Sequence, residues 1–397
     1  MTIDFYAEAE ELFPYTQKLR RDFHMHPEIG FQEVRTSGIV AEELTKLGIE
    51  IATGVGKTGV VGLIEGSGPG PVVLLRFDMD ALPIDEETGA EYASLNPGVM
   101  HACGHDGHTA VGLTVAQILE KHKDEWAGTV KLVFQPAEEG LGGARAMVKD
   151  GVLTNPVPDF SLGMHVWNDQ PTGKIAATSG PMMAAAEMFR VTITGKGAHG
   201  ASPHLGKDPI LAAAQIITAL QSVVSRNVDP LETAVVSITA INGGTAFNVI
   251  PPAVELKGTI RTYLPEIREM VLRRVEEIIQ GVAEAMQCTA EVSIEDVTPA
   301  VINDSRLAKL MNNVRQEVLP GTEDISGLQT MGSEDMAYLM DEIPGCYIFV
   351  GSKNEEKDLI YGHHHPKFDF DEQALLQGVA LISASAVAVL NGGVPEK

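Results

Sequence analysis

The chain has 397 residues, which exceeds the size at which one hydrophobic core keeps growing, so we expect two domains. Its 29 Lys and Arg residues face 54 Asp and Glu residues, and the resulting net charge of −25 at pH 7 makes nucleic acid a poor partner because phosphates would be repelled. No run approaches the roughly 20 uninterrupted apolar residues that span a bilayer, so we expect a soluble protein with no membrane partner.

The N-terminal residues and the cysteines bear on location. Residues 1–8 show no basic segment followed by an apolar core, so we expect no secretory signal. The three cysteines, Cys103, Cys288 and Cys346, form neither an even disulfide framework nor a Cys-x-x-Cys pair. We therefore expect free thiols and a cytoplasmic location.

The first half of the chain alternates between helical and strand patterns. Amphipathic periodicity predicts helices at 5–24 and 32–47, and a further helix at 106–122. Short apolar runs bounded by Gly and Pro predict strands. The predicted strands are 59–64, 72–77, 129–134, 160–165 and 174–178, joined later by 346–350. This alternation indicates an α/β fold with a mainly parallel sheet covered by helices.

The pattern changes near Glu187 to the order β-α-β-β-α-β, which is typical of a sheet covered on one face. The elements are strand 188–194, helix 209–224, strands 234–240 and 253–261, helix 266–286 and strand 289–295. The helices after Asp304 and the strand at 346–350 most naturally rejoin the first sheet. We therefore expect residues 185–296 to be an inserted domain, and 1–184 with 297–397 to form a discontinuous first domain.

The segment from His101 to His108 concentrates three imidazoles, a thiol and a carboxylate. Cys and His bind borderline transition metals, and one turn of chain can direct several of them to one point. Cys103 and His105 alone cannot fill a coordination sphere, so further ligands must come from elsewhere. Alternatively, Cys103 could be a nucleophile whose pKa is lowered by the nearby histidines.

Three other segments offer metal-binding side chains. Glu138 and Glu139 follow a predicted strand, at the sheet edge where α/β proteins place functional groups, so one could bind metal while the other acts as general base. His165 ends another predicted strand, and His364 lies in a histidine run near the C-terminus. Alone, each could be a solvated acidic loop or an ordinary histidine. Together with the thiol and imidazole of the preceding segment, they would suffice for two metal ions sharing a ligand.

These motifs, in this order, resemble a known family. They are His24-x-His26-Pro27-Glu28, Arg76 to Pro83, His101 to His108, Gln135 to Glu139, Gly163 to His165, and His364-x-Pro-x-Phe. The resemblance is to the amidohydrolase branch of the aminoacylase/carboxypeptidase metallopeptidase family, which contains N-acyl-amino-acid amidohydrolases, hippurate hydrolases and auxin-conjugate hydrolases. It implies a two-metal α/β domain interrupted by a β-α-β-β-α-β lid domain that usually mediates dimerisation, and hence a homodimer or a dimer-based oligomer.

The resemblance also implies roles for individual residues. The ligands of two divalent ions, which could be Zn, Mn, Co or Ni, would be Cys103, His105, Glu139, His165 and His364. The thiolate would be the bridging ligand, and Glu138 the general base. Asp78 and Asp80 would orient a ligating imidazole, although capping of the turn after a strand is an equal alternative for both.

In the inserted domain, residues 195–204 resemble the lid motif of the family. His199 would donate a hydrogen bond to the developing oxyanion, in its own subunit or across a dimer interface. Asn248 and Arg261 resemble the residues that hold a substrate carboxylate, a task that suits the fork of an Arg side chain. Without the resemblance, a surface salt bridge is the simpler interpretation of Arg261.

The implied function is metal-dependent hydrolysis of an N-acyl-L-amino acid, a small-molecule substrate, to a free amino acid and a carboxylic acid. Glu138 would take a proton from an activated water and deliver it to the leaving nitrogen. The alternatives are a metallocarboxypeptidase or dipeptidase, and a non-catalytic metal-dependent binding protein on the same fold. A carboxylate beside the ligand Glu139 argues against the non-catalytic alternative, because a closed structural site needs no such group. The acyl group and the metal stay open.

Overall fold

The chain divides into two compact units in the computed structural model, which describes residues 3–394. The first unit comprises the residues up to Met182, Ile302–Gln329 and those from Asp335 onward, and the second comprises Met183–Val301 and Thr330–Glu334. We expected residues 297–397 to belong entirely to the first domain. The structure instead assigns 297–301 and 330–334 to the second unit, and no hydrophobic periodicity announces the second of these segments.

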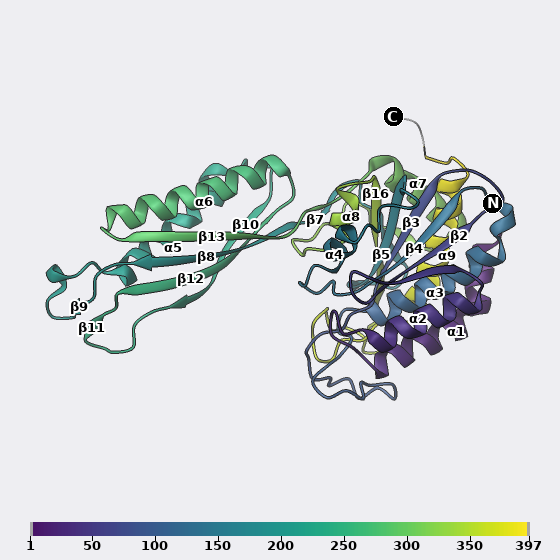
Figure 1. The fold of residues 1–397 in the computed structure, drawn as a ribbon, viewed down its shortest axis with the longest axis horizontal. Helices are drawn as coiled ribbons and strands as arrows, with labels where there is room; N and C mark the ends of the chain where they lie inside the picture. The colour runs from purple at the N-terminus through teal and green to yellow at the C-terminus, as the bar shows by residue number, and fades with distance from the viewer. Residues whose placement is uncertain (1–2, 395–397) are drawn as a thin grey trace. The chain divides into compact units, whose positions relative to one another are not determined.

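A mixed eight-stranded sheet forms the centre of the first unit (Figure 1), in the order β1-β2-β4-β3-β5-β16-β6-β15. Its strands are β1 (Glu50–Val55), β2 (Gly59–Glu65), β3 (Val72–Asp78), β4 (Thr129–Gln135), β5 (Phe160–Pro171), β6 (Lys174–Ala176), β15 (Glu323–Asp324) and β16 (Gly345–Lys353). The four neighbours β4, β3, β5 and β16 run parallel, whereas β1 and β2 pair antiparallel. The prediction of a helix-covered, mainly parallel sheet is thus confirmed. The sequence did not indicate β1, because most of its side chains are exposed and lack an apolar pattern.

Helices surround this sheet. They are α1 (Phe5–Met25), α2 (Val34–Lys46), α3 (His105–Lys121), α4 (Gly143–Lys149), α7 (Ser305–Val318), α8 (Ala337–Met340) and α9 (Gln373–Leu390). Helices α1, α3 and α9 contact one another, and both α3 and α9 contact β3 and β5. The start of α3 therefore lies beside the carboxyl ends of the parallel strands, which is where α/β proteins place functional groups.

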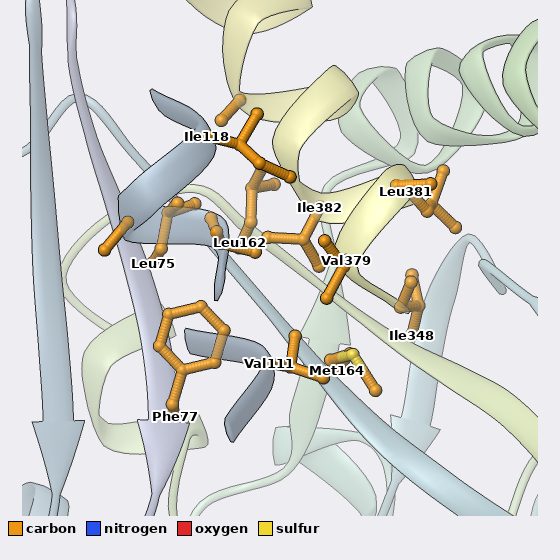
Figure 2. Packing of buried hydrophobic residues seen from close by; sticks show 14 of the residues in the cluster. Leu75, Phe77, Val111, Ile118, Leu162, Met164, Ile348, Val379, Leu381 and Ile382 are labelled. Atoms are coloured by element: carbon orange, nitrogen blue, oxygen red, sulfur yellow. The ribbon is translucent and has the colours of Figure 1, made fainter. Parts of the chain in front are cut away.

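The most apolar helix, α9, forms the core of the first unit rather than a membrane span. By length and composition α9 could cross a bilayer, but 83% of that window is buried within the protein, as is typical of a core helix. Figure 2 shows Val379 and Ile382 of α9 packed close to Val111 of α3 and to Leu162 and Ile348 of the sheet. Burial of each such side chain contributes about 1.5–3 kcal/mol to folding.

The second unit is an antiparallel sheet with the order β10-β12-β8-β13 and two helices. Its elements are β8 (Ala185–Thr194), α5 (Pro209–Asn227), β10 (Ala234–Asn242), β12 (Ala253–Thr262), α6 (Pro265–Ala285) and β13 (Thr289–Thr298), which follow the predicted β-α-β-β-α-β order. Two short strands, β9 (Ala198–His199) and β11 (Val249–Ile250), pair with each other. A further short pair, β7 (Gly180–Met183) with β14 (Val301–Asn303), belongs mostly to the first unit. Side chains of α5 and α6 share one apolar core with the sheet.

Candidate metal centre

The predicted ligand side chains of the first unit meet at the carboxyl edge of its parallel strands. Cys103 and His105 flank the start of α3, Glu139 follows β4, His165 lies in β5, and His364 lies in the loop before α9. The ligand atoms of Cys103, His105 and His165 lie within 4.8 Å of one another, as do those of Cys103, Glu139 and His364. The structure therefore brings together all five residues, although they are spread over more than half of the chain.

Local backbone geometry directs the first of these side chains. Gly104 separates Cys103 from His105 and has a φ of 95°, a left-handed conformation that side chains rarely adopt. A Cβ atom at this position would lie 2.3 Å from Cγ2 of Val166. Only glycine allows this turn so close to β5, and the turn places the thiol and the imidazole on the same site.

The loop of His364 is fixed by its backbone. The amide of His364 donates a hydrogen bond to the carbonyl oxygen of Ala102 at 2.8 Å, and its φ is 65°. A bulky residue holds such a conformation only where the surroundings impose it, and such residues cluster at functional sites. The result is that His364 Nε2 lies 3.3 Å from Glu139 Oε1.

Two imidazoles direct their Nε2 atoms into the site. His105 Nδ1 donates to Asp80, 3.0 Å from its carbonyl oxygen and 3.3 Å from Oδ1, while His105 Nε2 is buried without a hydrogen-bond partner among the described residues. His165 Nδ1 donates to the carbonyl oxygen of Val166 at 2.5 Å, and its Nε2 lies 3.4 Å from Cys103 Sγ. Because each ring donates through Nδ1, its Nε2 faces the site and can bind a metal ion once it carries no proton.

Two neighbouring histidines are oriented differently. His108 Nε2 accepts the amide proton of Val166 at 2.9 Å and its Nδ1 donates to Asp78 Oδ1 at 2.6 Å, so the ring has no lone pair left for a metal. His363 Nε2 likewise accepts from the amide of Asn168 at 3.2 Å, which places its proton on Nδ1, 3.9 Å from Cys103 Sγ. His363 is therefore a hydrogen-bond donor to the sulfur, a role that the sequence did not indicate.

The two aspartates after β3 have different contacts. Asp80 accepts from His105, as expected of a residue that orients a ligand, and its two carboxylate oxygens also accept the amides of Glu138 and Glu139 at 2.9 and 3.0 Å. Asp78 Oδ2 lies 3.7 Å from His105 Nε2, but the hydrogen bonds of Asp78 are to His108 and Arg76. Asp80 alone of the pair thus hydrogen-bonds to a predicted ligand, and it also fixes the turn that carries both glutamates.

The electrostatics of the site favour a cation. Burial raises the pKa of the Cys103 thiol well above its usual value, and the charges of Glu139 and Glu138 raise it further. Burial lowers the pKa of His105, but Asp78 and Asp80 outweigh burial and raise this pKa to about 10. A thiol that resists ionisation is a poor nucleophile, so this arrangement argues against the thiol-enzyme alternative. A bound divalent cation would reverse the balance and stabilise the thiolate.

A buried ionic network supports the metal-binding segment and was not anticipated from the sequence. Arg20 is fully buried and contacts Asp106 at 2.9 Å and Asp369 at 2.6 Å, while His24 Nδ1 lies 2.7 Å from Asp106. These contacts connect α1 to the first turn of α3. A signal was available, since Arg20 and His24 stand four residues apart on the buried face of α1.

The predicted residues of the second unit fall into two groups. His199 ends β9, and the carbonyl oxygen of Asn248 accepts the amide of Gly200 at 2.8 Å, so His199 and Asn248 are neighbours. Arg261 lies elsewhere, since it pairs with Ala186 near the end of β12, whereas the start of β12 adjoins the β9 segment. The structure therefore does not bring Arg261 together with the other two.

The surroundings of Arg261 rule out a surface salt bridge, which was the simpler interpretation of this residue. Its Nη1 donates to Thr259 Oγ1 at 2.6 Å and to the carbonyl oxygen of Ile260 at 3.2 Å. Over residues 3–394, no carboxylate lies within salt-bridge distance of the partly buried guanidinium. Within this described range Arg261 thus makes no salt bridge, although the nearby charge of Glu187 partly offsets the burial that lowers its pKa.

Comparisons with known proteins agree with this geometry. A profile described as peptidase family M20/M25/M40 matches residues 74–387. The chain is 41% identical over 388 residues to IAA-amino acid hydrolase ILR1-like 5 of Arabidopsis thaliana, covering 97% of this chain and 88% of the relative. It is also 41% identical over 373 residues to N-acetylcysteine deacetylase of Bacillus subtilis, covering 94% of this chain and 96% of the relative. The solved structure of the Bacillus subtilis YXEP protein, described as a dinuclear metal binding peptidase from the M20 family, matches with a TM-score of 0.85 and 37% identity over 96% of this chain and 99% of that chain.

Proposed function

The chain belongs to peptidase family M20/M25/M40 and is a hydrolase, and from this premise we propose that it cleaves the amide bond of N-acyl-L-amino acids with the aid of two bound divalent metal ions. The products would be a free amino acid and a carboxylic acid. Two relatives named for acting on an N-acetyl amino acid and on IAA-amino acids support this substrate class.

The observation that carries the proposal is the convergence of five metal-binding side chains. The nitrogen Nε2 of His105 and of His165, the sulfur of Cys103, and the Glu139 and His364 pair share one site, and we assign these five residues as ligands. A mixed set of sulfur, nitrogen and oxygen donors suits Zn, Mn, Co or Ni. When bound, two such ions would polarise the scissile carbonyl and lower the pKa of an attacking water from about 15.7 toward 7.

Glu138 is the residue that we assign as general base. A carboxylate oxygen of Glu138 lies within 4.8 Å of ligand atoms of both His105 and Glu139, so it borders the proposed metal position while a neighbouring carboxylate provides the ligand. The Glu138 carboxylate would accept the proton of the attacking water and return it to the leaving nitrogen.

For the second unit we propose that His199 stabilises the oxyanion and that Asn248 and Arg261 bind the substrate carboxylate. The partly buried guanidinium of Arg261 supports this assignment, because its hydrogen bonds go to neutral groups, Thr259 and the carbonyl of Ile260. Ala253 pairs with Thr194 next to the β9 segment, so the length of β12 separates Arg261 from His199 by roughly 25 Å at the usual strand rise. One copy of this unit cannot bring both residues to one small substrate, so a second copy would have to supply one of them.

This separation leads us to propose a homodimer formed through the second unit. Exposed apolar side chains of that unit support it: Phe247 is 103% exposed, and Leu205 and Val249 are 60% and 52% exposed. The strands β10 and β13 lie at the edges of the sheet and offer unpaired backbone groups for a partner. A twofold interface would place two lids against each other and let His199 of one copy serve the partner.

The test of the function is an assay of the metal-reconstituted protein on a substrate panel. The panel contains N-acetyl, N-benzoyl, long-chain N-acyl and indole-acetyl amino acids together with unblocked dipeptides. We expect cleavage of N-acyl amino acids, loss of this activity with a chelator, and recovery with Zn²⁺, Mn²⁺, Co²⁺ or Ni²⁺. Cleavage of the dipeptides alone would instead indicate a dipeptidase, and no cleavage of any member would support a non-catalytic protein.

The thiol alternative is tested on the same panel. Activity that survives chelation but is lost after alkylation of the metal-free protein would identify Cys103 as a nucleophile. We also propose a cytoplasmic location, because Cys103, Cys288 and Cys346 are all free and buried.

A further inference from the structure

The turn that carries Glu138 and Glu139 is held by carboxylates from two distant segments. The amide of Ala137 donates to Glu33 Oε1 at 2.9 Å, and the two following amides donate to Asp80. Ala137 has a φ of 55°, a left-handed conformation that disfavours residues with a Cβ. Three successive amides are thus hydrogen-bonded to side chains outside the turn, and the first of these bonds holds the most strained residue.

The side chain of Glu33 does not cap α2, although Glu33 occupies the N-cap position of this helix. It precedes α2 at the N-cap position but makes no side-chain capping hydrogen bond. The Glu28 carboxylate caps α2 instead, accepting the amides of Arg35 at 2.9 Å and Thr36 at 2.8 Å. Glu33 therefore turns its carboxylate inward, away from the helix that it precedes.

The inward position is costly unless it serves another purpose. Glu33 is 0% exposed, and burial raises its pKa. Its two carboxylate oxygens are both used, Oε1 by Ala137 and Oε2 by the Thr58 hydroxyl at 2.6 Å. Hydrogen bonds stabilise a buried carboxylate, and of the two partners of Glu33 only the Ala137 amide lies next to the proposed base.

The backbone preceding Glu33 also contacts the same turn. A Cβ atom added to Gly30 would lie 2.9 Å from Cα of Ala137 and 2.9 Å from Cδ1 of Leu141. The segment from Gly30 to Glu33 therefore packs directly against the turn that carries Glu138.

We propose that Glu33 is a positioning residue for Glu138, which it places by holding the Ala137 amide and its left-handed backbone. This inference rests on the proposed function, since it assumes that Glu138 is the base. Glu33 touches neither substrate nor metal in this scheme. It acts through the turn, where a displacement near 1 Å can lower the rate roughly 100-fold.

The experiment compares metal-loaded Glu33→Ala, Glu33→Gln and Thr58→Val with the wild type. The amide of Gln can still be oriented to accept from Ala137 and donate to Thr58, so Glu33→Gln should behave like the wild type. Glu33→Ala should lower kcat by roughly 10- to 100-fold with KM changed less than about 3-fold. Thr58→Val removes the other partner of Glu33 and is the matched control, for which we expect kcat within about 3-fold of the wild type.

A second measurement does not depend on activity. Amide hydrogen exchange of the peptide that spans residues 134–141, followed by mass spectrometry, should be at least roughly 10-fold faster in Glu33→Ala and unchanged in Glu33→Gln and Thr58→Val. Gly30→Ala, which pushes on the same turn, should also accelerate exchange and lower kcat. Unchanged exchange and kcat in Glu33→Ala would overturn the proposal, as would an equal loss in Thr58→Val, which would indicate general packing.

The experiments distinguish a wrong hydrolase function from a wrong positioning role of Glu33. If the wild type cleaves no panel substrate, the proposed function fails. The exchange experiment still decides whether Glu33 holds the turn. If the wild type is active and Glu138→Ala is inactive, yet Glu33→Ala is fully active, only the positioning role of Glu33 is wrong.

Discussion

In the buried histidines near the site, the hydrogen bond made by one ring nitrogen determines whether the other nitrogen is available to bind a metal ion. His105 and His165 donate through Nδ1 to oxygen atoms, which leaves Nε2 for a metal. His108 and His363 accept backbone amides at Nε2, which removes them from the ligand set. Three of these four residues lie in His-rich segments and His165 stands alone in a strand, so sequence context does not separate the two roles. The role depends on backbone groups that sequence motifs do not show.

The residue-scale prediction concerns the two adjacent glutamates. Glu138→Ala should lower kcat by roughly 100-fold or more, because the proton acceptor is lost, while both metal ions stay bound. Metal content by atomic absorption and steady-state kinetics are the measurements. Glu139→Ala is the matched control and should lose metal together with activity. Near-full turnover of Glu138→Ala would show that another group is the base.

At the scale of elements, the contact between α1 and α3 fixes the metal-binding segment. His24 and Arg20 of α1 bind Asp106, the residue next to His105, and His24 Nε2 also lies 3.3 Å from Glu86. Burial lowers the pKa of His24, but Asp106 outweighs burial and raises the pKa to about 9. Asp106 keeps its charge throughout the neutral range because Arg20 and His24 overcome the effect of burial and lower its pKa.

A pH dependence of stability follows from this contact. Because the folded-state pKa of His24 lies above its unfolded value of about 6.5, the stabilisation is complete below pH 6.5 and is lost as the pH rises through about 9. The difference in denaturant midpoint between metal-loaded wild type and His24→Gln should therefore be largest at and below pH 6.5, shrink as the pH rises from there, and be nearly absent above pH 9. The shift corresponds to about 3 kcal/mol at most. A difference that does not vary with pH would contradict the raised pKa.

At the scale of the whole molecule, the second unit divides its predicted residues between two ends of one strand. His199 and Asn248 lie by the short β9 and β11 pair, and Arg261 lies near the far end of β12. A substrate no longer than an N-acyl amino acid cannot contact both ends of the same strand. The dimer is therefore part of the proposed chemistry rather than only an assembly state.

Mixing two inactive variants tests the dimer. If His199 serves the partner subunit, a heterodimer of Glu138→Ala and His199→Ala contains one site with both residues intact. Random reassociation of equal amounts should then restore roughly one quarter of wild-type activity, because half of the dimers carry one working site of two. Each variant alone, taken through the same dissociation step, is the control. No recovery in a sample shown by mass spectrometry to contain heterodimers would place His199 in its own subunit.

Local sequence patterns predicted the longer helices and most of the longer strands in their order, and they pointed to the candidate site residues. Periodicity placed α3 at 106–122 against the observed His105–Lys121, and short motifs predicted five candidate ligand residues, which the structure brings together. These features are local, because a helical periodicity or a motif of His and Cys involves only residues that are close in sequence. Glu138 was visible for the same reason, as a carboxylate adjacent to a second one.

Only the tertiary structure decided which groups surround the site. The inward carboxylate of Glu33, the donor role of His363 and the separation of Arg261 from His199 depend on contacts between segments that are distant in sequence. The return of residues 330–334 to the second unit is equally non-local. Such contacts depend on how whole elements pack together. They could be identified only from the relative positions of β3, β4 and the segment before α2.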